Sequence, residues 1–312
     1  MLLRAVFKPR SLFRGFPQVW TVFGAICWGV RVLYGEGRLS EMIEAFREKP
    51  PFILTSPLPY TGDRYVFPKP ILPNRWEEPD SQEEYSLRKK VKGLRYVPED
   101  IFRKILDGEI RTNRELLGLL KEYKEDNYVA ELVVPHASIS RITWTTTGGE
   151  LYNEEVTAMS PFIVLFKFYS QDFVEEVKAS LRFAQLGGNK STGMGYFEVS
   201  FEEEKELRWL EDYMTSKTGR FVSLSPLLYS DSLDLEDSFY EPLTFTGAVD
   251  NYYGWYGRPI WKDRVIYLSE GSNLKVKEEK DFYGAFEKVM EYGGDTVYQY
   301  GYAFPLFVRW ES

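Results

Sequence analysis

A glycine-rich stretch between a predicted helix and a predicted strand places the tightest limits on how this chain folds. Residues 186–195 read Leu-Gly-Gly-Asn-Lys-Ser-Thr-Gly-Met-Gly, with four glycines, one lysine and two hydroxyl side chains. Glycine permits positive φ and lets another backbone approach closely. Successive backbone N–H groups in such a loop form a concave anion site, and Lys190 adds a positive charge. The stretch predicts a loop that holds a phosphorylated ligand. The alternative is a tight helix-to-strand connection.

The residues on either side of the loop define its context. Asp172 is expected to be a helix N-cap, with Glu175 three residues on as in a capping box. Apolar residues follow at helical spacing up to Leu181. After the loop, apolar and polar residues alternate over 197–201, which predicts a half-buried strand. The loop therefore runs from a helix to a strand.

A nucleoside-triphosphate loop of the Walker A type is excluded by spacing. That motif requires glycine directly before the lysine and a second glycine five residues earlier. Here Asn189 precedes Lys190, and Ala184 occupies the position of the first glycine. A Walker A loop also runs from strand to helix, so that helical N–H groups point at the phosphate.

A helix, a glycine-rich loop with Lys-Ser, then G-x-G and a strand resembles the signature of the RAMP superfamily of CRISPR proteins. Five further segments narrow the resemblance to the fourth-subunit family of type III-A Csm interference complexes. They are TVFGAICW at 21–28, TSPLPY at 55–60, YVFPKP at 65–70, HASISRIT at 136–143 and GELY at 149–152. Their order and spacing fit from the N-terminus to about residue 201.

The resemblance implies a non-catalytic RNA-binding subunit of a CRISPR antiviral effector, without a cofactor. Such a subunit holds the 5′ repeat-derived handle of CRISPR RNA. It contacts a large polymerase-like Csm subunit and a backbone Csm subunit. Two alternatives remain open, a RAMP-type endoribonuclease that processes CRISPR RNA and the sister subunit of a type III-B complex.

The order of predicted elements indicates an α+β chain with two ferredoxin-like (RRM-like) domains, at residues 1–203 and 204–312. The first reads as a βαββαβ unit, which is the ferredoxin-like motif. Its predicted elements are a strand at 2–7, a helix from Pro17 that stops at Gly35 and Gly37, a short helix capped by Ser40, and strands at 52–58, 64–68, 129–134 and 160–169. The second has predicted strands at 221–229, at 265–268 and within 298–310, and a helix at 282–292.

Residues 73–127 interrupt the first domain. They are dense in charge and poor in long apolar runs, and Pro73, Pro79 and Pro98 punctuate them. We expect short helices at 99–106 and 113–123 inside this insertion. The resemblance implies a thumb-like excursion, and the alternative is a mobile surface loop.

Charge divides the chain into a basic and an acidic part. The formal net charge is −8, yet residues 1–75 hold 11 basic and 5 acidic side chains, a net of +6. Residues 202–312 hold 12 basic and 21 acidic side chains, a net of −9. Because local basic patches set phosphate affinity, RNA is expected on one side and a protein partner on the other. The residues expected to bind RNA are Lys8, Arg10, Arg14, His136, Ser138, Ser140, Arg141, Gly187, Gly188, Asn189, Lys190, Ser191, Thr192, Gly193, Met194 and Gly195.

No catalytic constellation and no metal site is predicted. His136 is the single histidine, and it can transfer a proton, position RNA or make a structural hydrogen bond. The guanidinium of Arg141 matches phosphate geometry, with a salt bridge as the alternative. The acidic run at 231–237 lacks the glycine of a calcium-binding loop and is expected to be a solvated loop.

The remaining composition is that of a protein outside the membrane. The single cysteine, Cys27, cannot form a disulfide within the chain and is expected to be a small core residue. The apolar run at 19–34 contains Arg31 and is too short to span a bilayer, so a cytoplasmic protein is expected. Aromatic residues make up 17% of the chain and favour strands. Their cluster at 252–257 predicts a packed turn or a stacking surface.

Overall fold

The computed structural model describes residues 1–62, 64–73, 82–121, 123, 126–249, 261–292 and 295–310. The helices are α1 (Val19–Tyr34), α2 (Glu36–Glu48), α3 (Gln82–Gly93), α4 (Glu99–Asp107), α5 (Asn113–Leu119), α6 (Val174–Phe183) and α7 (Trp209–Thr215), with a 3-10 turn η1 (Lys190–Thr192). The strands up to residue 203 are β1 (Leu2–Pro9), β2 (Phe52–Leu54), β3 (Leu58–Pro59), β4 (Val66–Pro68), β5 (Tyr96–Pro98), β6 (Val129–Ile139), β7 (Thr146–Met159), β8 (Phe162–Phe168) and β9 (Phe197–Glu203). Those beyond it are β10 (Arg220–Ser223), β11 (Leu227–Leu228), β12 (Leu233–Phe239), β13 (Pro242–Phe245), β14 (Val265–Leu268), β15 (Asn273–Val276), β16 (Gly284–Tyr292), β17 (Asp295–Tyr302) and β18 (Pro305–Phe307).

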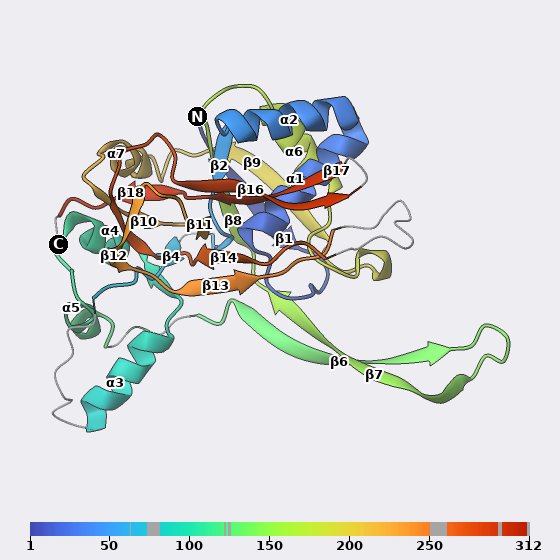
Figure 1. Ribbon diagram of the computed structural model, residues 1–312. Helices are drawn as coiled ribbons and strands as arrows, with labels where there is room; N and C mark the ends of the chain where they lie inside the picture. The colour runs from blue at the N-terminus through green and yellow to red at the C-terminus, as the bar shows by residue number, and fades with distance from the viewer. Residues whose placement is uncertain are drawn as a thin grey trace.

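The mixed content of helices and antiparallel sheets confirms the α+β class. The first sheet has the order β2-β8-β1-β9, and β3 also pairs with β8. Helices α1, α2 and α6 lie on one face of this sheet (Figure 1). Alternation along β1 divides its side chains, because Phe7 faces the helices while Leu2 and Val6 join the core on the opposite face. Helices α1 and α6 approach closely at Gly29, where an added Cβ would lie 2.4 Å from Ser180 Cβ.

The C-terminal part is built mainly from strands. Its sheets have the orders β12-β15-β10-β18 and β11-β14-β13, and β16 pairs with β17 as a hairpin. The expected helix at 282–292 is wrong, because β16 occupies it. A bulge between Lys288 and Met290 shifts the alternation by one residue. Apolar side chains at Phe286, Val289 and Met290 therefore fall at helical spacing although the backbone is extended. The expected acidic loop at 231–237 largely forms β12.

Two helix starts differ from the expected ones. Asp172 does not cap α6, because Phe173 is the N-cap, with φ 67 and no side-chain cap bond. The second helix begins at Glu36 rather than at Ser40, since Gly35 alone, with φ 91, turns the chain between α1 and α2. Gly37 consequently lies inside α2.

The described part of the 73–127 segment packs against the body of the protein. Helix α4 confirms the first predicted short helix, and α5 confirms the start of the second, with a capping box between Thr112 and Glu115, but it ends at Leu119 rather than at residue 123. Val97, Phe102 and Ile105 are buried in a core that also contains side chains from α7 and β18. Helix α3 extends away from the body, and the long hairpin of β6 and β7 projects from the molecule as well (Figure 1).

Candidate nucleic-acid interface

The glycine-rich loop at residues 186–195 closes on itself. The amide of Leu186 donates to the Gly195 carbonyl over 2.9 Å, so the two ends of the loop are joined. Gly195 has φ 75, and an added Cβ would lie 2.0 Å from the Leu186 oxygen. Only glycine fits there. The helix-to-strand context predicted for the loop is confirmed by α6 and β9.

Part of the loop's hydrogen-bonding capacity is used internally. The amides of Thr192 and Met194 donate to the Asn189 carbonyl at 3.1 and 3.3 Å, and that of Gly193 donates to Lys190 at 3.0 Å. The Thr192 hydroxyl also donates to Asn189, over 2.8 Å. An anion would therefore meet the exposed side of the loop, which presents Gly188, Ser191, Thr192 and Gly193, rather than a cradle made by every amide.

The basic segment that follows β1 lies against this loop. The Gly195 amide donates to the Leu12 carbonyl over 2.8 Å. An added Cβ on Gly188 would lie 3.2 Å from Arg14 Cδ, so the Arg14 side chain touches the loop. Among the described residues Arg14 has no acidic partner, and its side chain is exposed. The structure thus brings together the basic segment and the glycine-rich loop, which the sequence placed about 175 residues apart.

The other two basic residues of this segment lie beside a carboxylate. Arg10 pairs with Glu198 at 2.6 Å on an exposed surface, and this pairing raises the pKa of the Arg10 guanidinium. Lys8 is exposed and stands opposite Glu198 in the β1–β9 register. A surface ion pair of this kind stabilises little, so a phosphate can compete with Glu198 for Arg10.

Glu154 on β7 connects the projecting hairpin to the glycine-rich loop. One of its carboxylate oxygens accepts a hydrogen bond from the Asn189 side-chain amide, and the other lies 3.4 Å from His136 Nε2. The His136 ring stacks on Tyr152, with centroids 5.3 Å apart. The structure therefore brings His136 next to the loop. Sequence reasoning missed Glu154, because its role depends on the β6–β7 register that places His136 opposite Tyr152.

The remaining predicted residues lie farther out along the hairpin. Ser138 lies in β6. The Ser140 hydroxyl accepts the amides of Ile142 and Thr143, each over 3.3 Å, and so shapes the turn at the tip. Arg141 is exposed at this turn and has no carboxylate partner among the described residues. Two large apolar side chains flank it, since Ile142 is 92% and Trp144 82% exposed.

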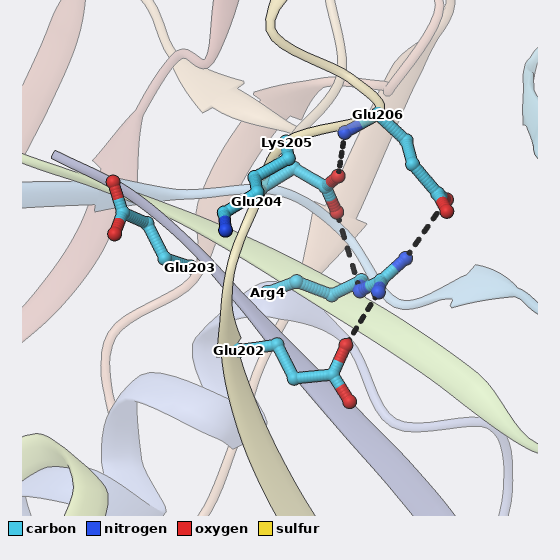
Figure 2. Close-up of a pocket in the computed structure, with 6 residues that line it drawn as sticks. All are labelled: Arg4, Glu202, Glu203, Glu204, Lys205 and Glu206. Carbon is cyan, nitrogen blue, oxygen red and sulfur yellow. Dashed lines mark hydrogen bonds and ion pairs between the residues drawn. The ribbon is translucent and has the colours of Figure 1, made fainter.

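A second charged cluster surrounds Arg4, at the edge where β9 leaves the first sheet. Figure 2 shows the Arg4 guanidinium directed at the carboxylates of Glu202, Glu204 and Glu206, at 2.6, 3.2 and 3.4 Å, while Glu203 points away. The side chain of Glu204 is fully buried and also accepts the Glu206 amide over 2.7 Å. The Arg4 guanidinium already contacts three carboxylates. The pocket lined by Arg4 and residues 202–206 is therefore a structural ion-pair cluster rather than an anion site.

The remaining expectations concern the cysteine, a metal site, a membrane span and the aromatic cluster. Cys27 belongs to α1 and packs, partly buried, against the core beneath that helix, and burial raises the pKa of its thiol to about 12. Within the described ranges no three His, Cys, Asp or Glu side chains gather closely enough to hold a metal. No helix in those ranges is long and apolar enough to cross a membrane. The aromatic cluster at 252–257 lies outside the described residues.

Comparison with known proteins gives consistent matches along the chain. The sequence model of the RAMP superfamily matches residues 21–198. A protein of Thermococcus onnurineus (strain NA1) described as CRISPR system Cms protein Csm4 is 26% identical over 314 residues, covering 96% of this chain and 94% of its own length. The fold is similar to that of a chain in a Csm1-Csm4 cassette in complex with pppApA, with TM-score 0.64, 23% identity and coverage of 99% and 98% of the two chains. It is also similar to a chain in a Csm3-Csm4 subcomplex of a type III-A interference complex, with TM-score 0.61, 18% identity and coverage of 97% and 98%.

Proposed function

Because the chain belongs to the RAMP superfamily, we propose that it is a non-catalytic RNA-binding subunit of a type III-A CRISPR effector. It holds the 5′ repeat-derived handle of the CRISPR RNA and acts in the cytoplasm. The similarity to Csm4 of Thermococcus onnurineus along almost the whole chain supports the type III-A assignment.

The observation that carries the proposal is the contact between the basic segment and the glycine-rich loop. Arg14 touches Gly188, and Arg10 and Lys8 extend the positive surface along β1. A glycine backbone and an arginine without an acidic partner in the described part of the chain suit phosphate oxygens, because arginine binds such oxygens with two parallel hydrogen bonds. Single-stranded RNA bound in this way is recognised through phosphate, 2′-hydroxyl and splayed bases.

The fold supports a division into two domains at residues 1–203 and 204–312. The order β2-β8-β1-β9, with α1 and α6 on one face, matches the order expected of a ferredoxin-like domain and supports this assignment. Residues 73–127 form its thumb-like insertion, and the projecting β6–β7 hairpin follows them in the chain. The second domain is a strand-rich variant of the same plan, in which the β16–β17 hairpin takes the place of a helix.

The subunit has no nuclease activity of its own in this proposal. His136 is the sole histidine, and its neighbours are Glu154 and Tyr152, which orient the ring. A metal-free ribonuclease needs a general base and a general acid, but among the described residues the two candidate partners of His136 have structural contacts: Glu154 accepts the Asn189 amide and Tyr152 stacks on the His136 ring. His136 therefore positions the hairpin.

The two faces of the molecule take different partners. The net charge of −9 over residues 202–312 disfavours phosphate, so the second domain faces protein. By analogy with the Csm1-Csm4 and Csm3-Csm4 assemblies, those proteins are the large polymerase-like subunit and a backbone subunit.

The test is to purify the full chain with its effector and sequence the bound RNA from the 5′ end. A uniform repeat-derived handle is expected, whereas random RNA would contradict the proposal.

In direct binding assays Arg14→Ala is expected to weaken binding at every sequence and to reduce the salt slope by about one. Lys217→Ala is the matched control, because that lysine pairs with Glu279 in the second domain at 2.8 Å. Specific cleavage of repeat RNA that His136→Ala abolishes would favour the endoribonuclease alternative.

A further inference from the structure

Tyr196, directly after the glycine-rich loop, holds an exposed ring on a fixed backbone. Its side chain is 50% exposed. Its amide donates to the Ser11 hydroxyl over 2.8 Å, and its carbonyl accepts the Arg10 amide over 2.9 Å. The next residue, Phe197, is buried and packs against Phe7 with ring centroids 4.9 Å apart. The backbone of Tyr196 is therefore held from both sides while its ring remains in solvent.

The position of Tyr196 follows from the alternation of β9. Phe197 points into the helix-covered core, so Tyr196 and Glu198 project from the opposite face of the sheet. On that face Leu2 and Val6 of β1 are covered by the core shared with the C-terminal part. Lys8, farther along the same strand, is exposed. Tyr196 thus stands at the uncovered end of the face, next to the basic segment.

The neighbours of Tyr196 indicate what would cover it. The Arg10 amide donates to the Tyr196 carbonyl, the Arg10 guanidinium pairs with Glu198 at 2.6 Å, and Lys8 lies on the adjacent strand. A protein partner that buried this ring would have to desolvate these charges, which is costly. A nucleotide offers a flat base for the ring and a phosphate for the cations, and aromatic side chains are the usual platforms for such bases.

We propose that Tyr196 is a stacking platform for one base of single-stranded RNA, whose backbone is held by the glycine-rich loop and the basic segment. The inference rests on the proposed RNA-binding function and adds a base-contacting residue to it. Stacking involves the face of the ring, so the site tolerates any base and does not need the tyrosine hydroxyl. It releases no counterions, so it contributes to affinity without contributing to the salt dependence.

The test compares RNA affinity and its salt dependence in the full chain and its Tyr196 variants, using a repeat-derived single-stranded RNA. Tyr196→Ala is expected to weaken binding roughly 5- to 100-fold with an unchanged salt slope. Tyr196→Phe and Tyr196→Trp should bind like the parent, because they keep a π-face. Tyr229→Ala is the matched control, since Tyr229 is 48% exposed in the second domain, and it should bind like the parent.

Direct contact is measured with a series of RNAs that each carry 2-aminopurine at one position. One position is expected to be quenched by the parent and by Tyr196→Phe but not by Tyr196→Ala. If Tyr196→Ala binds like the parent, or Tyr196→Phe loses as much affinity as Tyr196→Ala, the stacking inference is wrong while RNA binding stands. If the parent binds no RNA at any salt concentration, the proposed function itself is wrong.

Discussion

Gly193 and Gly195 both adopt positive φ in the same loop, yet their surroundings differ. Gly193 has φ 87 and nothing within 4 Å of an added Cβ. Gly195 has φ 75, and its added Cβ would meet the Leu186 carbonyl at 2.0 Å. At the first position a side chain only strains its own backbone, while at the second it also breaks the hydrogen bond that joins the ends of the loop.

This difference predicts unequal effects of the same substitution. Gly193→Ala is expected to lower the free energy of unfolding by about 1 kcal/mol, which is the cost of a left-handed residue. Gly195→Ala is expected to lower it by about 3 kcal/mol or more, because overpacking adds to the strain. Urea denaturation of the two variants and the parent measures both values. Equal decreases in the free energy of unfolding would show that residue 195 requires glycine only for its positive φ, and not because of the contact with Leu186.

Some residues of the candidate site could be predicted from the sequence, and others could not. The lysine, the glycines and the basic segment are recognisable by residue type, because phosphate chemistry requires them. Glu154 carries no such signal, since a glutamate on a strand is ordinary until the pairing of β6 with β7 places it between His136 and Asn189. Tyr196 is intermediate, because its position after G-x-G is visible while its exposure depends on the alternation of β9.

At the scale of elements, local patterns predicted most strands and helices of residues 1–203, although they missed α3, β3, β5 and β7. In the C-terminal part, tertiary contacts override one local pattern. The segment at 282–292 has apolar residues at helical spacing, but stacking of Phe286 on Tyr298 at 5.1 Å and a bulge make it a strand. The length of the β6–β7 hairpin was not predicted either, because apolar side chains on its outer part, such as Ile139 and Leu151, are exposed, and its described side chains form no buried apolar stripe.

The hairpin and the glycine-rich loop are expected to be coupled through Glu154. Glu154→Ala removes the acceptor of the Asn189 amide, so the loop should open more often and trypsin should cleave after Lys190 faster than in the parent. Glu154→Gln keeps a carbonyl acceptor for Asn189 and should protect the loop nearly as well as the parent. The protease reports the population of the open loop when opening is fast.

Glu155→Ala is the control for this coupling, because Glu155 is exposed on the neighbouring position of β7. It is expected to leave the cleavage rate after Lys190 unchanged. If Glu154→Ala also leaves that rate unchanged, the carboxylate bridge does not order the loop.

At the scale of the whole molecule, the two proposed domains share their apolar cores. Tyr300 of β17 lies in the core beneath α1, 4.9 Å from the ring of Phe23, and its hydroxyl accepts the Leu54 amide over 3.2 Å. On the other face of the first sheet, Leu2 and Val6 are buried with Leu306 of β18. Residues 1–203 alone would therefore expose large apolar surfaces on both faces of their sheet.

This shared packing predicts that the chain unfolds as one cooperative unit. Tyr300→Ala is expected to lower the free energy of unfolding by about 3–5 kcal/mol, as for other large core truncations, whereas Tyr229→Ala, at an exposed site, should change it by less than about 0.5 kcal/mol.

Hydrogen exchange under increasing denaturant measures which strands lose stability in Tyr300→Ala. Because β1 and β10 belong to one cooperative unit, their amides should report the same unfolding free energy in the parent and the same reduction in Tyr300→Ala. A loss confined to β16 and β17, with β1 and β8 unaffected, would mean that the domains fold independently. In that case the fragment 1–203 would be expected to fold on its own.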